Sequence, residues 1–257
     1  MRVKAIILDL DRTLLHTDKT VSSYTAAVLK ECRHHAIRLM AATARPLRDA
    51  EQYCDAIGFD AMTVSNGARI ICGSRRKEYG ICRKSAEHLL NALSRNPALR
   101  VTLETGDRAY SKQPTEEYET ILCDDLAGIA GTEGALKILV HIDSAETLAE
   151  VEKELTDDLY YTVSGGSLMQ IMNKSATKWN GIQEMLYFCG CSPDSAAFFG
   201  DDYDDIEPIR MCGIGVAVAN GIEEVKAAAD FTAESNDRDG PAKFIERFIL
   251  HKQPDSD

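Results

Sequence analysis

The sequence predicts an α/β fold in which a doubly wound parallel sheet is interrupted by a second, smaller α+β domain. Apolar runs such as residues 3–8 are nearly continuous, which is typical of strands buried on both faces of a parallel sheet. Segments with helical spacing follow such runs near both ends of the chain. In the middle, strand candidates are separated by turns as often as by helices, which favours an antiparallel sheet with helices on one face.

The first part of the core, residues 1–81, alternates strands and helices. A helix is expected over 21–35, where Thr20 or Ser22 can cap the first turn. A second helix opens at Pro46, because a first helical turn tolerates proline. The strands of this part are expected at 3–8, 37–42, 61–64 and, after the turn at Asn66-Gly67, from residue 69 onward.

The second domain is expected over residues 82–172 and the second part of the core over 173–257. In the domain, helices over 86–93 and 145–155 are expected among strands at 99–103, 109–112, 136–142 and 160–163. In the core, the alternation resumes with helices over 177–188, 206–211, 222–228 and 240–250, and with strands at 196–199 and 214–218. The tail after Gln253 is expected to be disordered.

The composition excludes several classes of protein. Lys and Arg total 29 against 41 Asp and Glu, and the net charge of -12 argues against a nucleic-acid or anionic-membrane partner. The 8 cysteines are scattered without paired metal-ligand spacing, as in a reducing compartment. The first apolar run reaches Asp9 too early for a signal peptide, and no apolar stretch approaches the ~20 residues of a membrane span. We expect a soluble, cytoplasmic protein.

Polar side chains follow the core strands at the ends where ligands bind in open α/β sheets. Asp9 and Asp11 come after the first strand, and Thr43 comes after the second. Lys178 opens the helix that follows the second domain, and the acidic run 201–205 follows the next strand. Each residue alone has an ordinary explanation as a cap, a turn or a solvated charge, so the prediction depends on their joint order at one sheet edge.

The two acidic clusters would repel each other at this edge unless a cation bridged them. Oxygen-only ligands favour Mg²⁺. A hydroxyl (Thr43) and an ammonium (Lys178) beside the metal suit a phosphoryl group. A carboxylate there can act as a nucleophile and form an aspartyl phosphate, while a second carboxyl protonates the leaving oxygen and later activates water.

This combination resembles the haloacid dehalogenase-like (HAD) superfamily of phosphohydrolases, and more narrowly its Cof-type branch. The segment Asp9-Leu10-Asp11-Arg12-Thr13 is similar to the first motif of that family. The resemblance implies that Asp9 is the nucleophile and a metal ligand. It also implies that Asp11 is the general acid and base, and that its backbone carbonyl binds Mg²⁺.

The remaining motifs have counterparts in the same order. By the resemblance, Thr43 and Ala44 bind the phosphate, and Lys178 holds it and neutralises the nucleophile. Asp201 is implied as a metal ligand with Asp205 in support. The long stretch between Thr43 and Lys178 places the insert after the third strand, where the family carries its α+β cap domain on a Rossmann-like core. In that family the cap excludes water and contributes to substrate selection.

Three positions depart from the family's usual pattern. Gly is usual where Arg12 and Ala44 stand, and Asn is usual where Asp204 stands, near the bound phosphate. A carboxylate at 204 would repel a phosphate. We therefore hypothesise that Arg12 offsets Asp204, which a double-mutant cycle on Arg12→Gly and Asp204→Asn tests.

The predicted function is a Mg²⁺-dependent phosphatase acting on a small phosphorylated metabolite, either a sugar phosphate or a phosphorylated cofactor. Glu104, Arg108, Tyr160 and Tyr161 are candidates for the substrate-facing side of the cap. A monomer or small homo-oligomer is expected. Three alternatives remain: a phosphotransferase or phosphomutase with the same intermediate, a catalytically weakened binding or regulatory protein, and a phospho-accepting receiver domain. The large insert and the Asp9-x-Asp11 arrangement disfavour the receiver domain.

Overall fold

The computed structural model describes residues 2–115 and 119–251, with the backbone alone for residues 54 and 55. These residues form two compact units. The core unit comprises Met1–Arg45, Asp49–Lys77 and Thr177–Asp257, and the inserted unit comprises Pro46–Arg48 and Glu78–Ala176. The expected domain boundaries at 81/82 and 172/173 lie a few residues from these divisions. The tail after Gln253, expected to be disordered, lies outside the described residues.

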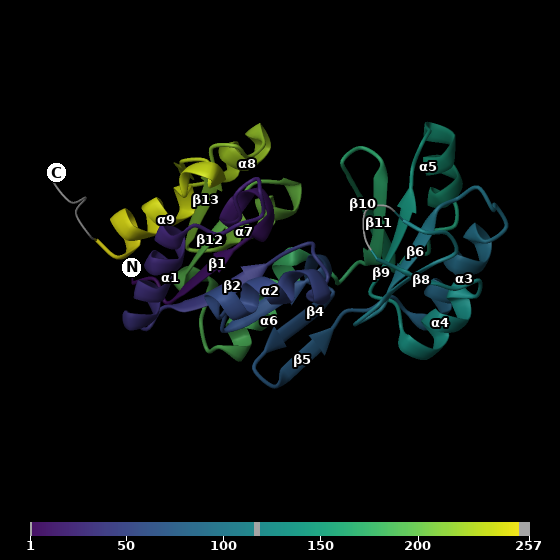
Figure 1. Cartoon of the computed structure of the whole chain (residues 1–257), viewed down its shortest axis with the longest axis horizontal. Coiled ribbons are helices and arrows are strands. Elements are labelled where there is room, and N and C mark those ends of the chain that lie inside the picture. Colours follow the sequence, from purple (N-terminus) through teal and green to yellow (C-terminus); the bar gives the residue numbers. More distant parts are fainter. Residues whose placement is uncertain (1, 116–118, 252–257) are drawn as a thin grey trace. The chain divides into compact units, whose positions relative to one another are not determined.

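The core unit is built on one sheet in the order β14-β13-β12-β1-β2-β3-β4-β5. Neighbours from β14 to β3 are parallel, and β4 returns antiparallel to β3. Consequently β1 lies beside β12 although the two are far apart in the sequence (Figure 1). The strands are β1 Ala5–Leu8, β2 Arg38–Ala42, β3 Ala61–Val64, β4 Arg69–Cys72, β5 Arg75–Glu78, β12 Ala196–Gly200, β13 Ile214–Val218 and β14 Phe231–Ala233.

The helices of the core begin where the sequence offers caps. Ser22 Oγ accepts a hydrogen bond of 3.0 Å from the backbone N–H of Thr25 at the start of α1. Thr177 Oγ1 accepts one of 3.1 Å from the backbone N–H of Asn180 at the start of α6. The helices are α1 Ser23–His34, α2 Leu47–Ile57, α6 Lys178–Phe188, α7 Ile206–Met211, α8 Glu223–Ala228 and α9 Gly240–Phe244, the last continued by a wider turn over Ile245–Ile249.

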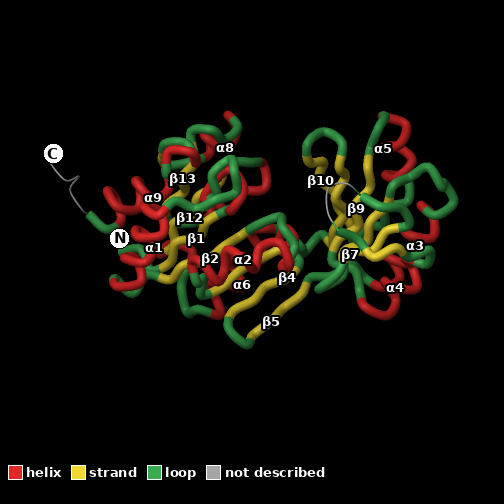
Figure 2. Tube along the Cα trace, in the orientation of Figure 1, coloured by secondary structure: helices red, strands yellow, loops and turns green. Residues whose placement is uncertain are grey.

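The inserted unit is a second sheet in the order β10-β11-β9-β6-β7-β8, antiparallel except between β7 and β8. Figure 2 shows its helices on one side of that sheet. The elements are α3 Arg83–Leu93, β6 Val101–Glu104, β7 Ala109–Ser111, β8 Ile121–Leu122, α4 Leu126–Glu133, β9 Lys137–His141, α5 Ala145–Glu152, β10 Leu159–Ser164 and β11 Leu168–Asn173.

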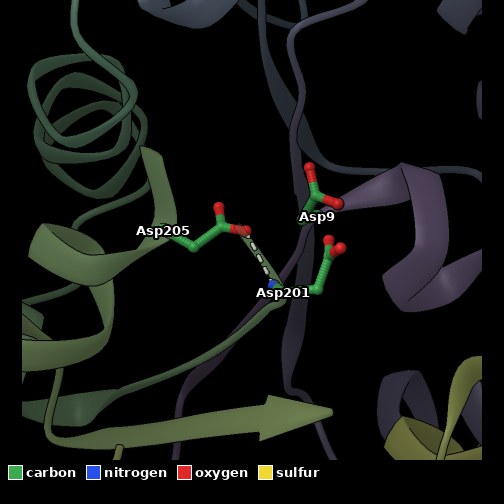
Figure 3. A group of neighbouring side chains, drawn as sticks. All are labelled: Asp9, Asp201 and Asp205. Carbon is green, nitrogen blue, oxygen red and sulfur yellow. Dashed lines mark hydrogen bonds between the residues drawn. The ribbon is translucent and has the colours of Figure 1, made fainter. Parts of the chain in front are cut away.

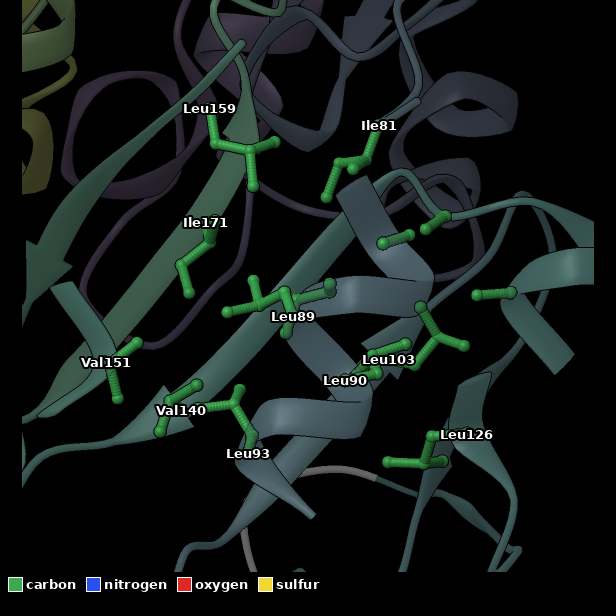
Figure 4. Packing of buried hydrophobic residues seen from close by; sticks show 14 of the residues in the cluster. Ile81, Leu89, Leu90, Leu93, Leu103, Leu126, Val140, Val151, Leu159 and Ile171 are labelled. Atoms are coloured by element: carbon green, nitrogen blue, oxygen red, sulfur yellow. The ribbon is translucent and has the colours of Figure 1, made fainter. Parts of the chain in front are cut away.

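Strand alternation divides the inserted sheet into an apolar face and a polar face. Leu103, Val140 and Ile171 pack against α3 residues such as Leu89 in one buried cluster (Figure 4). The candidate Tyr161 packs against this cluster, on the helix side. The candidates Glu104 and Tyr160 alternate with cluster residues and therefore belong to the opposite face.

The polar face carries a buried cation. The Lys137 side chain is almost fully buried and donates a hydrogen bond of 2.8 Å to Gln170 Oε1 across the sheet. The Tyr160 hydroxyl donates a hydrogen bond of 2.5 Å to the backbone carbonyl of Ala176. The candidate Arg108 lies outside the strands, in the loop between β6 and β7.

Several elements were not expected from the sequence. The charged strand β5 is largely exposed and forms the edge of the core sheet beside β4. The helix α4 is rich in Gly and Ala and has no marked amphipathic pattern. The strand β11 follows the Gly165-Gly166 turn and pairs along its whole length with β10. Among the described residues, no helix is long and apolar enough to cross a membrane.

Candidate active site

Three carboxylates meet at the carboxyl-terminal edge of the core sheet. Asp9 follows β1 and Asp201 follows the neighbouring strand β12, while Asp205 ends the short 3₁₀ turn Tyr203–Asp205. One oxygen of each carboxylate lies within 4.8 Å of the others. Figure 3 shows the three side chains directed toward one another. All three are buried, and Asp205 is completely so.

Asp205 fixes the loop that carries Asp201. Its Oδ2 accepts hydrogen bonds from the backbone N–H groups of Asp201 (2.8 Å) and Asp202 (3.1 Å). Gly200 is required for this approach, because a Cβ there would lie 2.4 Å from the Asp205 carboxyl carbon. The local sequence Gly-Asp-Asp-Tyr-Asp-Asp therefore closes on itself and holds the Asp201 side chain at the sheet edge.

Lys178 is a buried ammonium between two of the carboxylates. Its Nζ donates to Asp9 Oδ1 at 3.0 Å and to Asp205 Oδ1 at 2.6 Å. The start of its helix packs tightly against the turn Ser65–Gly67. Gly67 has φ +96°, and a Cβ there would lie 1.9 Å from the Thr177 carbonyl oxygen. The Asn-Gly pair after β3 thus sets the position of the helix that presents Lys178.

Burial and like charge dominate the electrostatics of this group. Burial raises the pKa of Asp9 well above its usual range, and the Asp205 and Asp201 charges raise it further against the opposing effect of Lys178. Burial also raises the pKa of Asp201 to about 6, with a contribution from Asp205. For Lys178, burial is outweighed by Asp205 and Asp9, which raise the pKa of the ammonium. The single Lys178 ammonium hydrogen-bonds to two carboxylates, and the third carboxylate, Asp201, lies close by.

Asp201 has two further partners from the turn after β1. The Thr13 hydroxyl donates to Asp201 Oδ1 at 3.0 Å, and Arg12 Nε lies 3.7 Å from Asp201 Oδ2. Arg12 has φ 60°, the left-handed region in which glycine is favoured. Its Nη2 donates to the Asn220 carbonyl at 3.0 Å, and the Asn220 amide donates to the Arg12 carbonyl at 2.7 Å. These bonds offset the cost of the backbone conformation.

A profile of the haloacid dehalogenase-like hydrolases matches residues 6–245, a stretch that includes all of these side chains. The chain belongs to this family.

The matches to relatives and to solved structures cover nearly the whole chain. The chloroplastic endoribonuclease YBEY of Arabidopsis thaliana is 26% identical over 95% of the chain, which spans 46% of that protein's length. The 5-amino-6-(5-phospho-D-ribitylamino)uracil phosphatase YitU of Bacillus subtilis (strain 168) is 24% identical over 95% of the chain and 97% of its own. A haloacid dehalogenase-like hydrolase from Bacteroides thetaiotaomicron has a TM-score of 0.85 at 25% identity, over 96% and 99% of the two chains.

These findings confirm three of the predictions from the sequence. The resemblance to the Cof-type branch and the α/β fold class are confirmed. The enzyme class, a phosphoric monoester hydrolase, is also confirmed.

The residues predicted to bind the phosphate lie on adjacent elements of the hydrolase core. Thr43 follows β2 and is buried, and its Oγ1 accepts a hydrogen bond of 3.1 Å from the backbone N–H of Arg45. Its carbonyl accepts one of 3.1 Å from the backbone N–H of Asn66. The Asn66 amide in turn donates to Asp204 Oδ2 at 2.5 Å. Thr43, Ala44 and Asp204 therefore belong to loops that are bonded to each other through Asn66.

These contacts bear on the hypothesis that Arg12 offsets Asp204. The Arg12 guanidinium lies against Asp201 and the Asn220 carbonyl. Asp204 accepts from Asn66 and contributes to the raised pKa of Lys178. The geometry thus favours Asp201 over Asp204 as the charge that Arg12 offsets.

Asp11, predicted as the acid and base, is oriented apart from the acidic group. Its Oδ2 accepts from Arg45 Nε at 2.6 Å, and its Oδ1 accepts from Arg45 Nη2 and from Lys19 Nζ, both at 2.7 Å. Burial opposes the ionised form, but these hydrogen bonds outweigh it and lower the pKa of Asp11. The side chain is 36% exposed.

Five residues that contact the site were not predicted from the sequence as site residues: Thr13, Lys19, Arg45, Asn66 and Asn220. Thr13 stands within the segment that is similar to the family's first motif, Arg45 directly follows Thr43 and Ala44, and Asn66 opens the turn after the third strand. Position along the chain was therefore available as a signal for these three residues. For Lys19 the sequence carried no specific signal, because its contact with Asp11 depends on the backbone conformation of the loop between β1 and α1.

Proposed function

We propose that this protein is a Mg²⁺-dependent phosphatase that hydrolyses a small phosphorylated metabolite through an aspartyl phosphate on Asp9. The observation that carries the proposal is the buried group of Asp9, Asp201 and Asp205 around the Lys178 ammonium. Such a concentration of negative charge in a buried place is costly unless cations balance it. Lys178 supplies one positive charge, and a divalent cation would supply the rest.

The donor set fits a hard cation, because it consists of oxygen atoms. Asp9 and Asp201 would hold Mg²⁺ together with the Asp11 backbone carbonyl. Asp205, whose oxygens accept from Lys178 and from two backbone N–H groups, would support the site by fixing these partners. When bound, Mg²⁺ would neutralise charge on the phosphoryl oxygens and on the carboxylates.

Each side chain of the site has its own role in the proposed reaction. An Asp9 carboxylate oxygen attacks phosphorus, the bond to the leaving oxygen breaks, and Asp11 donates a proton to that oxygen. Asp11 then takes a proton from a water molecule, which attacks phosphorus and releases inorganic phosphate and the Asp9 carboxylate. Lys178 and the loop at Thr43 and Ala44 hold the phosphoryl oxygens throughout.

The substrate class follows from what a metal-bound phosphoryl site can accept. We propose a sugar phosphate or a phosphorylated cofactor, as a small molecule with one phosphate monoester. The name of the relative YitU, a phosphatase of a phosphorylated ribityl compound, supports this class. We propose residues 82–172 as the cap that selects the remainder of the substrate, and the cytoplasm as the compartment.

Hydrolysis of para-nitrophenyl phosphate tests the proposal. We expect turnover that needs Mg²⁺, that stops when the metal is chelated, and that falls by at least about a thousandfold in Asp9→Asn. The matched control is Asp157→Asn, which neutralises an exposed aspartate of the inserted unit and should leave turnover unchanged. Equal turnover in wild type and Asp9→Asn would overturn the assignment of Asp9.

A further inference from the structure

Two cysteine thiols of the core unit lie in contact with each other. Cys72 ends β4 and Cys189 directly follows α6, and their Sγ atoms are 3.6 Å apart. Both residues are partly exposed. A third thiol, Cys191, donates to the Cys189 carbonyl at 3.8 Å. The fold thus brings together two cysteines that are 117 positions apart in the sequence.

Other side chains hold the same elements together close to the thiols. In β5, the strand beside β4, Lys77 Nζ donates to Glu184 Oε1 of α6. The Arg75 guanidinium carbon lies 5.7 Å from the centre of the ring of Phe188, the last residue of α6. The approach of the two sulfur atoms is therefore part of a wider contact between α6 and the strands β4 and β5.

The thiols have room for the small movement that a disulfide requires. A disulfide bond is about 2 Å long, so the sulfur atoms have to approach by roughly 1.5 Å, which is within the reach of side-chain rotation. Each cysteine is followed by a glycine in the left-handed region, Gly73 at φ +58° and Gly190 at φ +66°. A Cβ at either glycine would meet no heavy atom within 4 Å. Both turns therefore face open space and can adjust.

The thiol pair lies at the end of the core sheet opposite to the carboxylates. β4 runs antiparallel to β3, and the register pairs Ile71 with Met62 near the start of β3. Cys72 is thus beside the amino-terminal ends of the parallel strands, whereas the acidic group lies at their carboxyl-terminal ends. The 11 residues of α6 separate Lys178, at its start, from Cys189 by about 16 Å. The pair is therefore a site distinct from the acidic group.

We propose that Cys72 and Cys189 are a modification site that forms a reversible disulfide, with a low-molecular-weight disulfide such as oxidised glutathione as the oxidant. Cys72 loses its proton to water and attacks one sulfur of the oxidant, whose S–S bond breaks and releases one glutathione thiolate. That thiolate takes the proton of Cys189, and the Cys189 sulfur attacks Cys72 in the mixed disulfide. The bond between the two cysteines forms, and the second glutathione leaves as a thiolate and takes up the proton that Cys72 released. Two protein thiols are oxidised and one glutathione disulfide is reduced to two thiols.

Cys189 ionises poorly at neutral pH. Burial raises the pKa of its thiol to about 12, and the hydrogen bond with Cys72 adds to this effect, while the Arg38 cation opposes it. Exchange needs a thiolate, so Cys189 is the second sulfur to react and the disulfide forms slowly. The state of the pair is therefore best measured at equilibrium, after long incubation.

The disulfide closes a large ring of the chain. Residues 73–188 lie between the two cysteines, and this stretch includes residues 78–176 of the inserted unit. A cross-link over so long a loop removes much of the conformational freedom of the unfolded chain. The oxidised protein is therefore more resistant to denaturants than the reduced protein.

Equilibration of the full chain in buffers of reduced and oxidised glutathione tests the proposal. After an acid quench and alkylation in denaturant, we expect the oxidised protein to carry two fewer free thiols than the reduced protein. Peptide mass spectrometry should identify the linkage between Cys72 and Cys189, and dithiothreitol should reverse it. Cys72→Ser and Cys189→Ser should each abolish the linkage, whereas Cys191→Ser, the matched control, should retain it. A linkage that uses Cys191, or a mixed disulfide with glutathione that persists on unlinked Cys72, would overturn the proposal.

Urea unfolding gives a second readout of the same cross-link. The unfolding midpoint of wild type should rise by about 1 M on oxidation, and reduction should return it to its starting value. Cys72→Ser should have the same midpoint in both buffers, and Cys191→Ser should behave as wild type. A rise of equal size in Cys72→Ser would show that the effect has another origin and would contradict the proposal.

Discussion

Asp9 and Asp11 stand two residues apart in the sequence, yet the fold gives them opposite surroundings. Asp9 is buried beside Asp201 and Asp205, and its pKa is raised. Asp11 is partly exposed among the cationic groups of Arg45 and Lys19, and its pKa is lowered. The comparison shows that the residue type determines little about the charge of a carboxyl group and that the partners brought by other loops determine most of it.

Removing Lys178 should have the largest effect on turnover and stability, because its ammonium is the cation that hydrogen-bonds to the buried carboxylates of Asp9 and Asp205. In Lys178→Met, turnover should fall at least about a hundredfold. Without divalent cations, the free energy of unfolding should fall by about 3–5 kcal/mol, since the buried carboxylates lose their ammonium. Denaturant unfolding in a chelator measures this. Lys226→Met, which removes a surface pair with Glu223, is the control. A loss below about 1 kcal/mol would contradict the expectation.

Asp201 should give the metal-free protein a distinctive pH dependence. The folded state raises its pKa to about 6 from 3.8, so folding favours the protonated form. Its contribution to stability is therefore present below about pH 4 and is lost as the pH rises through about 6. In a chelator at pH 7, Asp201→Asn should be more stable than wild type by about 2 kcal/mol, and the difference should close toward pH 4. Unfolding curves at several pH values measure it, and a constant difference would argue against this origin.

Arg45→Lys should have the smallest effect on stability, since the Asp11 side of the comparison is partly solvated. The substitution keeps the charge but removes the paired N–H donors. We expect the free energy of unfolding to fall by less than about 1 kcal/mol. Arg38→Lys, at the exposed pair of Arg38 with Asp60, is the matched control. A loss above about 2 kcal/mol in Arg45→Lys alone would show that Asp11 is a structural group as well.

The core was more predictable than the inserted unit, for a physical reason. Strands buried on both faces, such as β1 and β12, must be apolar throughout and are therefore visible as runs in the sequence. The exception within the core is β5, which is charged because it lies at a sheet edge that solvent reaches. The helix α4 lacks the periodicity by which a helix is recognised. This helix was missed because local pattern carries little information where burial is partial.

The sequence by itself determined the order of the chemical groups at the sheet edge. Asp9, Thr43 and Asp201 each directly follow an apolar strand, and the ends of parallel strands must converge. Only the tertiary structure decided the partners of each group. Arg12 pairs with Asp201, Asp204 accepts a hydrogen bond from Asn66, and Lys19 pairs with Asp11. The first two pairs join residues on separate loops, and all three depend on backbone directions and rotamers that local sequence does not specify.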